Sequence, residues 1–414
     1  MENPHASRRF PIYLAAGAMV ICLVVSVGPA ESRHKTSAEQ AVYDRDPEHL
    51  WNRLYEALFV RVGPDGGTYG RDRFEPLLWL GSKHLLQGPS HDCGVKLLDQ
   101  FLDKHGEKLI EDPLKRALLQ RDLWMLFSWL EGMHTHGGGF GIPPEKLVES
   151  QRRLDRPLAA VMRRLALSRD QIKKLPDNYA DAVKSGRFAK SHVSEKPDKP
   201  YLPPDLFSAD GPWVCVGRPD RPVAPEHVQK ANTLANSAFL IFLRLPGGRD
   251  ATRKYLKREK GDLPAGSEVA LVRRALLIAA RAVITPTNLI ESVQLRVYEK
   301  TGLSVSEFRL SRAMLLAGQA GGLRAVGEGE RDFKTGFAGS AGDPFEEPPV
   351  SQDFGVRRVD IRAECTGCHS RDRFPGLRAP RPLLEVRAAR AMETAVKWKR
   401  ERVDWKALRK LLSE

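Results

Sequence analysis

The chain has 414 residues, of which 42% are hydrophobic and 29% are charged. This length excludes a single minimal domain, and the composition is ordinary for a globular chain that buries a core. Lys and Arg number 66 against 52 Asp and Glu, a formal net charge of +14 at pH 7. The excess favours an anionic partner such as an acidic protein, beside the simpler interpretation of a solvated basic surface. Because no nucleic-acid recognition motif occurs, we expect no nucleic acid among the partners.

Residues 1–30 have the pattern of a signal peptide. Arg8 and Arg9 precede an uncharged, mostly apolar run over 12–27, and Ala30 supplies a small residue where a signal peptidase would cut. An uncleaved anchor is the alternative, but sixteen residues of helix span about 24 Å, short of a hydrocarbon core of ~30 Å. We therefore expect a mature chain that begins near Glu31, lies in the periplasm or outside the cell, and has no membrane span.

The region 47–195 is predicted to be a helical domain. A leucine recurs every fourth residue from Leu50 to Leu58, which is helical spacing. Asp112 followed by Pro113 is a typical helix start, and an apolar run with helical periodicity follows it until near Gly132.

The region 205–330 is predicted to be a β-rich domain with an antiparallel sheet. Short apolar or alternating runs, several of them rich in β-branched or aromatic residues, favour strands. These runs cover residues 213–216, 238–243, 269–278 and 293–298. Residues 250–260 are expected to form a helix between strands. Proline, glycine and charge mark 196–204 and 327–349 as linkers or long loops.

The last segment, 353–414, forms a short tail. Its residues 356–363 alternate like a strand, and 383–412 have the periodicity of one or two helices. The expected fold class is thus α+β: an N-terminal helical domain, a central antiparallel β-rich domain and a short, mostly helical C-terminal tail.

The tail contains a haem c attachment motif. Cys365-Thr366-Gly367-Cys368-His369 matches Cys-x-x-Cys-His, in which two thiols add to the two vinyl groups of the porphyrin. The adjacent histidine then ligates the iron from the proximal side. A chance match in this composition has an expected frequency of about 0.002 per chain, treating positions as independent. The motif therefore predicts one covalent haem c held by Cys365 and Cys368, with His369 on the iron.

Other interpretations of Cys365 and Cys368 are a thioredoxin-like redox pair, a structural zinc site and a simple disulfide. The redox pair needs a βαβ setting that the sequence does not show, and the zinc site needs two further ligands at near spacing. The simple disulfide stays open as an alternative to haem.

The sixth iron ligand is not fixed by the motif. Met392 is the one methionine after it, and helix-borne methionine is often core. Histidine is the other ligand type that fits, although a lone histidine is usually a core or surface residue. The histidine candidates are His84, His91, His105, His134 and His136. An open sixth position is a further alternative, and His134 and His136 with Glu131 could instead form a separate metal site.

Two further cysteines would remain in the mature chain, Cys93 and Cys215. In an oxidising compartment they could form a disulfide, but the sequence does not supply the distance test that a disulfide requires. Two buried free thiols are the alternative.

Several phrases of the chain carry a family resemblance. They are LWNRLYEALFVRVGPDG (50–66), DPLKRALLQRDLW (112–124), LPPDLF (202–207), FLRLPGGR (242–249), EFRLSRAMLLAGQAGGLRAVG (307–327) and CTGCHS (365–370). With them the chain resembles an uncharacterised group of secreted bacterial proteins that end in a haem c motif. The resemblance covers nearly the whole mature chain and implies one joined architecture, with no activity attached. The phrase that contains His84 and His91 also looks like part of the shared pattern.

These observations predict a secreted monohaem c-type cytochrome that transfers electrons to a redox partner protein. One alternative is a haem-dependent, peroxidase-like oxidoreductase with an open iron site. Another is a secreted binding or structural protein whose cysteine pair is only a disulfide. The sequence shows no catalytic residue over the iron, so whether the protein is an enzyme is left open.

Overall fold

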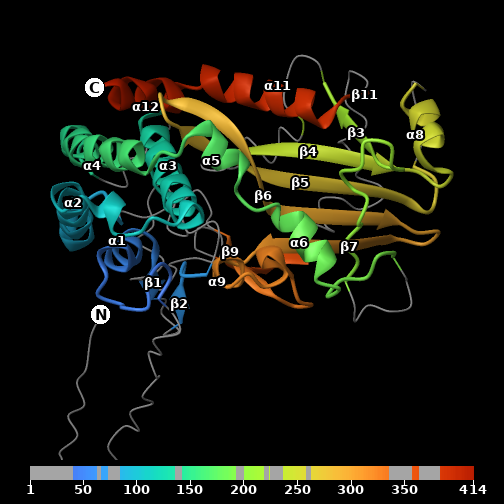
Figure 1. The fold of residues 1–414 in the computed structure, drawn as a ribbon, viewed down its shortest axis with the longest axis horizontal. Helices are drawn as coiled ribbons and strands as arrows, with labels where there is room; N and C mark the ends of the chain where they lie inside the picture. The colour runs from blue at the N-terminus through green and yellow to red at the C-terminus, as the bar shows by residue number, and fades with distance from the viewer. Residues whose placement is uncertain are drawn as a thin grey trace, which may run out of the picture. The chain divides into compact units, whose positions relative to one another are not determined.

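An α+β fold, as the sequence predicts, organises the part of the chain that the computed structural model describes (Figure 1). The described residues are 41–62, 67–72, 84–135, 142–192, 200–218, 223, 236–257, 263–334, 357–362 and 383–414. All of them belong to one compact unit, Ala38–Glu414.

The region predicted to be helical, 47–195, is mostly helical where it is described, but it also contains two short paired strands, β1 (Arg61–Val62) and β2 (Thr68–Tyr69). Its helical elements are α1 (Leu50–Phe59), α2 (Gly88–Asp103), a 3-10 turn η2 (Gly106–Lys108), α3 (Pro113–Thr135), α4 (Pro144–Leu165), α5 (Arg169–Lys173) and α6 (Asn178–Lys184). The predicted start of α3 at Pro113 is confirmed, whereas the helix runs on to Thr135 and does not end near Gly132. Every residue of α3 between Ala117 and Leu130 is buried, so α3 is a core helix that packs on all sides.

A seven-stranded antiparallel sheet forms the β-rich region. Its strands are β3 (Val214–Gly217), β4 (Ser237–Arg244), β5 (Ser267–Ala279), β6 (Val283–Tyr298), β7 (Leu303–Leu310), β8 (Leu323–Ala325) and β11 (Leu384–Glu385). The strand order is β11-β3-β4-β5-β6-β7-β8. Three of the four predicted runs lie wholly in strands, and the fourth, 213–216, lies in β3 except for Trp213, which precedes it. Helix α8 (Gly248–Leu256) lies between β4 and β5 as expected. Strands β7 and β8, the helix α9 (Arg312–Leu316) and the turn η4 (Ala320–Gly322) were not predicted.

Strand β7 escaped prediction because its apolar alternation is broken by charge. Glu307 is only 4% exposed and stands at a buried position of the strand. Its carboxylate accepts a hydrogen bond from Arg309 at 2.5 Å, and its backbone carbonyl accepts one from Val326 at 2.8 Å. A pattern based on hydrophobicity alone places a glutamate in a loop, although a glutamate whose carboxylate is hydrogen-bonded can be buried in a strand.

Two small hairpin-like pairs accompany the main sheet. β1 (Arg61–Val62) pairs with β2 (Thr68–Tyr69), and β9 (Arg331–Lys334) pairs with β10 (Arg357–Asp360). The predicted strand in the tail is therefore confirmed in β10. The expectation of a linker throughout 327–349 is wrong for β9, because the backbone groups of this segment are paired with β10.

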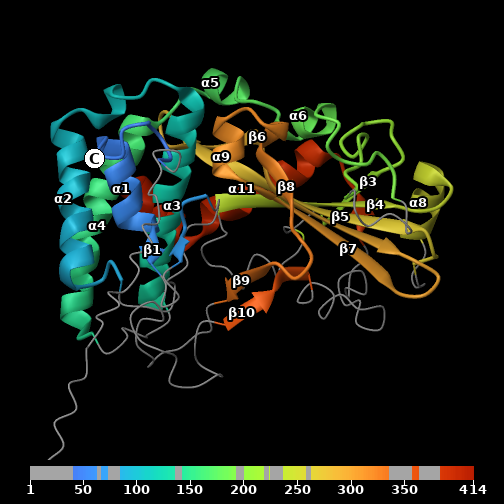
Figure 2. The same ribbon diagram turned by 90° about the horizontal axis from the view of Figure 1, so that it is seen from below.

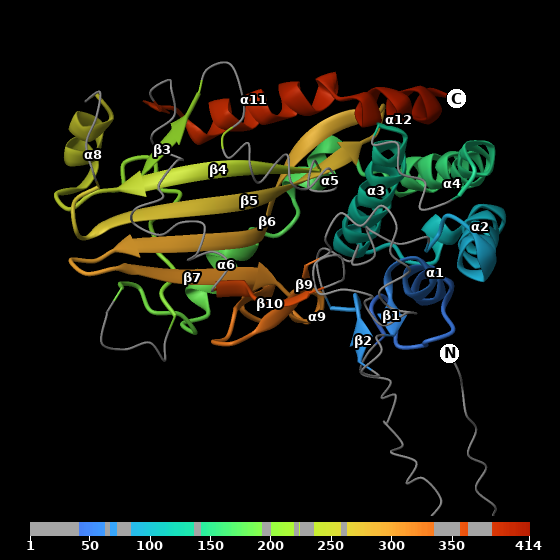
Figure 3. The same ribbon diagram turned by 180° about the vertical axis from the view of Figure 1, so that it is seen from behind.

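The tail ends in two helices, as predicted: α11 (Ala388–Glu401) and α12 (Val403–Ser413). The predicted helical start at 383 is wrong, because Leu384 and Glu385 pair with β3 as strand β11 and the first helix begins at Ala388. Helix α11 packs against β4 and β6, and α12 packs against α3 and α4. Figures 1 and 3 show both helices along one border of the sheet, with α12 reaching the helical region. Helix α6 lies on one face of the sheet, since it is in front of β6 in Figure 1 and behind it in Figure 3. The C-terminal helices thus connect the sheet and the helical region.

One hydrophobic core extends through the predicted helical and β-rich domains. It contains Trp124 of α3, Leu154 of α4, Val293 of β6 and Trp405 of α12 in a single cluster. The rings of Trp124 and Trp405 lie 5.6 Å apart between centroids. Among the described helices, none combines the length and the apolar composition that crossing a bilayer requires.

Candidate functional site

The predicted haem attachment residues, Cys365, Cys368 and His369, lie outside the described residues. The described chain on either side of them is held in the fold. Before the motif, Ile361 is 5% exposed, and its N–H donates to the carbonyl of Glu330 at 3.1 Å.

After the motif, strand β11 continues the main sheet next to β3. Leu383 is buried in a cluster with Val214 and Leu243. Glu385 accepts hydrogen bonds from Arg253 at 2.8 Å and Arg249 at 3.4 Å, and its bonds with Arg253 lower the pKa of this carboxyl below its usual range. Figure 2 shows β9 and β10 side by side, apart from the strands of the main sheet. Along the chain, β10 precedes the attachment segment and β11 follows it.

His91 is a predicted ligand candidate that the fold buries and orients. It is the fourth residue of α2 and is 3% exposed. Its Nδ1 lies 3.0 Å from the carbonyl oxygen of Leu85. A carbonyl only accepts hydrogen bonds, so this contact assigns the proton to Nδ1 and the lone pair to Nε2. The Nε2 atom is buried and has no hydrogen-bond partner within the described chain.

The other candidate ligands lie in different settings. His84 is half-buried and opens the segment that leads to α2. His105 has a side chain that is 60% exposed and lies 3.4 Å from Glu107. Met392 is 5% exposed and belongs to the hydrophobic core on α11, beside Ala395 and Val396. Met392 is therefore a core residue, which was the alternative to a role as iron ligand.

The described residues do not include all of the side chains of the separate metal site considered for Glu131, His134 and His136. His136 and the side chain of His134 lie outside them. No cluster of three or more His, Cys, Asp or Glu side chains that could hold a metal occurs among the residues the structure describes.

Cys93 and Cys215 are free thiols. The disulfide considered for them is thus absent, and the alternative of two buried thiols holds for Cys215 alone, because Cys93 is exposed. Burial raises the pKa of Cys215 to about 12, so this thiol is unreactive at neutral pH.

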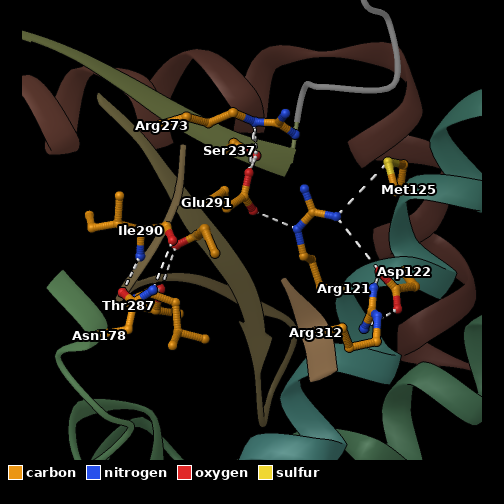
Figure 4. A network of polar contacts seen from close by, with 12 residues as sticks. Arg121, Asp122, Met125, Asn178, Ser237, Arg273, Thr287, Ile290, Glu291 and Arg312 are labelled. Atoms are coloured by element: carbon orange, nitrogen blue, oxygen red, sulfur yellow. Dashed lines mark hydrogen bonds and ion pairs between the residues drawn. The ribbon is translucent and has the colours of Figure 1, made fainter. Parts of the chain in front are cut away.

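A buried polar network joins helix α3 to the sheet (Figure 4). Arg121 donates from Nε to Glu291 at 2.5 Å, and Arg273 approaches the second oxygen of Glu291 at 2.7 Å. Ser237 of β4 donates to the same oxygen at 2.6 Å. Glu291 therefore ties α3 to two neighbouring strands, β4 and β5.

Asp122 forms the second centre of this network. Arg312 of α9 binds it with two nitrogens, at 3.0 and 3.1 Å, and Arg121 lies 3.7 Å away. Tyr43 donates its hydroxyl to Asp122 at 3.4 Å. Burial raises the pKa of Asp122 above its ordinary value, while Arg312 acts in the opposite direction. Because each carboxylate here contacts two guanidinium groups, we interpret the network as a structural link between elements.

A β-bulge places Glu291 in this network. Along the β5–β6 pair, Ser292 is opposite Arg273 and Ile290 is opposite Arg274, so Glu291 is the extra residue of β6. Extra residues of this kind redirect side chains. Next to it, Asn178 of α6 bonds both backbone groups of Ile290, at 2.7 and 3.0 Å.

A second buried ionic cluster lies where α12 meets α3 and α4. Lys399 and Asp404 form a short, buried ion pair, and Arg402 contacts Asp404 at 3.0 Å. Burial lowers the pKa of Lys399 to about 8, against the opposing effect of Asp404. Nearby, burial and then Glu131 raise the pKa of Asp155 to about 8.

The sequence patterns did not predict the buried network around Glu291 and Asp122. The signal available was Arg121 and Asp122 in the middle of an otherwise apolar helix, a position where charge requires partners. Those partners, Glu291 and Arg312, lie 170 and 190 residues away in sequence, so no local pattern points to them.

The chain matches no family model, no curated protein and no solved structure. Roles for individual residues therefore follow here from their chemistry and geometry alone.

Proposed function

We propose that this protein is a monohaem c-type cytochrome that transfers electrons outside the cytoplasm. The observation that carries the proposal is the attachment motif from Cys365 to His369. The signal-peptide pattern of residues 1–30 supports it independently, because haem c is attached to proteins after export. The partner would be a redox protein, and an acidic one would complement the net charge of +14.

In this proposal Cys365 and Cys368 would hold the porphyrin and His369 would ligate its iron. The bound haem would supply a one-electron redox centre. The chain's own task would be to fix the ends of the attachment segment, and two described contacts are suited to it. One is the bond from Ile361 to Glu330, and the other is the pairing of β11 with β3.

Covalent attachment is the property to test. The full chain should be produced with a haem c maturation system and extracted with acidified acetone. We expect the colour to stay with the protein, the mass to equal that of the mature chain plus one haem, and the pyridine haemochrome spectrum to be that of a thioether-linked haem. A Cys365→Ser, Cys368→Ser double variant should lose the haem.

Cys93→Ser is the matched control, since Cys93 is a free thiol on the surface and should not affect attachment. Loss of all colour into the acetone, or a mass equal to that of the bare chain, would show that the cysteine pair has another role. If attached haem binds cyanide or carbon monoxide readily without any substitution, an open iron site and the peroxidase-like alternative gain support.

A further inference from the structure

We infer that the outward face of α11 and α12 binds the anionic headgroups of a lipid bilayer, so that the protein lies on a membrane surface. The inference goes beyond the proposed function and does not depend on the haem. It rests on the charge of these two helices, on the burial of their apolar sides, and on the composition of the face that they expose.

Positive charge is concentrated at the C-terminal end of the chain. Residues 387–414 contain nine Lys and Arg against four Asp and Glu, a net charge of +5 out of +14 for all 414 residues. Seven of the nine basic residues are exposed, whereas Lys399 and Arg402 are paired with Asp404. Arg390 pairs with Glu393. Six exposed basic side chains make no ion pair with the described chain: Arg387, Lys397, Arg400, Lys406, Arg409 and Lys410.

Helical spacing gathers these charges on one side of each helix. In α11, Arg390, Lys397 and Arg400 are separated by seven and then three residues, which places them on the same face. In α12, Lys406 and Lys410 are four residues apart. The opposite faces are buried in the core, through Met392, Ala395 and Val396 in α11 and through Trp405, Leu408 and Leu412 in α12. The charged faces therefore point away from the body of the protein.

The fold holds both helices in this orientation. Helix α11 packs against β4 and β6, and α12 packs against α3 and α4. The two helices follow one another along one border of the sheet (Figures 1 and 3). Their 14 and 11 residues add up to roughly 37 Å of helix at about 1.5 Å per residue. Because their apolar faces are already buried, charge can draw them to a bilayer surface, but those faces cannot enter it while the protein stays folded.

The composition of the exposed face favours lipid headgroups over an acidic protein. The centre of a protein–protein interface is usually poor in charge and rich in aromatic side chains. In the described helices α11 and α12, Val403 is the one large hydrophobic side chain that is exposed. Trp398 is half-buried, and the guanidinium of Arg402 lies 5.2 Å from its ring centroid. An anionic bilayer needs only a row of cations, each of which raises the affinity by about fivefold.

The test measures binding of the exported full chain to lipid vesicles by sedimentation. We expect it to bind vesicles of phosphatidylcholine with about one third phosphatidylglycerol, and to leave vesicles of phosphatidylcholine alone unbound. Binding should be lost between about 0.1 M and about 1 M salt, which shortens the screening length from ~10 Å to ~3 Å. A Lys397→Gln, Lys406→Gln, Lys410→Gln triple variant should bind roughly a hundredfold more weakly, because three of the exposed cations are removed.

The matched control is a Lys184→Gln, Arg187→Gln, Lys190→Gln triple variant. It removes the same charge from exposed residues at and after the end of α6. Helix α6 packs against β8 at the edge of the sheet, whereas α11 packs against β4. The control should bind anionic vesicles within about twofold of the parent, because its substitutions lie outside the proposed contact and surface charges are screened over ~10 Å.

Absence of binding to the anionic vesicles at low salt would overturn the proposal. Equal weakening in both triple variants would overturn it too, because net charge alone would then attract the chain. Binding to polyglutamate but not to the anionic vesicles would replace it with an acidic protein partner. All of these results are independent of covalent haem, so they are distinct from failure of the proposed function.

Discussion

At the scale of single residues, burial controls the charge of Lys399. Its side chain is 1% exposed, and its ammonium lies 5.2 Å from the centroid of the Trp124 ring as well as against Asp404. Burial lowers the pKa of Lys399 from 10.5 to about 8. Between these two values the unfolded chain binds a proton that the folded chain has released, so folding becomes more favourable as pH rises.

Replacing Lys399 with Met should therefore remove a pH dependence. We expect the parent to gain about 3 kcal/mol in its free energy of unfolding, relative to Lys399→Met, between pH 8 and pH 10.5. Urea titrations of both proteins across this range would measure the difference. Lys397→Met, on the exposed side of the same helix, is the control and should give a constant offset. A constant offset for Lys399→Met as well would mean that Lys399 stays protonated in the fold.

At the scale of elements, Gly321 allows η4 and α6 to approach each other. Its φ is +60°, and a Cβ atom there would lie 1.8 Å from the carbonyl oxygen of Asn178. The same Asn178 bonds Ile290 of β6 through its side chain. The position of α6 on the sheet therefore depends on Gly321, a glycine in η4, which is far from α6 in the sequence.

Gly321→Ala should destabilise the fold by about 2–5 kcal/mol, which combines left-handed backbone strain with overpacking. Gly329→Ala isolates the first effect, because Gly329 has a φ of +67° and open space around it. It should lose only about 1–2 kcal/mol. Denaturant midpoints measured at equal m-values would separate the two effects. Equal losses in both variants would show that α6 moves aside to make room.

At the scale of the whole molecule, the network around Glu291 holds the helical region to the sheet. Glu291→Gln would leave Arg121 and Arg273 buried without their carboxylate, a change that typically destabilises a protein by about 3–5 kcal/mol. We expect a loss of this size in chemical unfolding, with the helices and the sheet losing structure together because they share one core.

The matched control is Glu393→Gln. Glu393 pairs with Arg390 on the surface, where the two side chains are 65% and 68% exposed. Losing an exposed pair should change the free energy of unfolding by less than about 1 kcal/mol. If Glu291→Gln changes the free energy of unfolding by the same small amount, the buried ion pairs of Glu291 do not stabilise the fold more than an exposed pair does.

The sequence by itself determined the local elements and the expectation of haem. Leucine spacing from Leu50 and the Asp112-Pro113 start are confirmed in α1 and α3, and the apolar runs are confirmed in four strands of the sheet. These signals succeed because each depends on residues two to four positions apart. The haem motif is equally local, since its chemistry needs five consecutive residues, and it stays a prediction because those residues lie outside the described chain.

Only the tertiary structure decided which distant residues meet. The bulge that turns Glu291 toward Arg121, the free state of Cys93 and Cys215, and the core position of Met392 each depend on packing between elements far apart in sequence. The same holds for the burial of His91 and for the contact of its Nδ1 with the Leu85 carbonyl oxygen. Periodicity shows that a residue lies on the inner face of an element, but which atoms it meets there depends on how the elements pack.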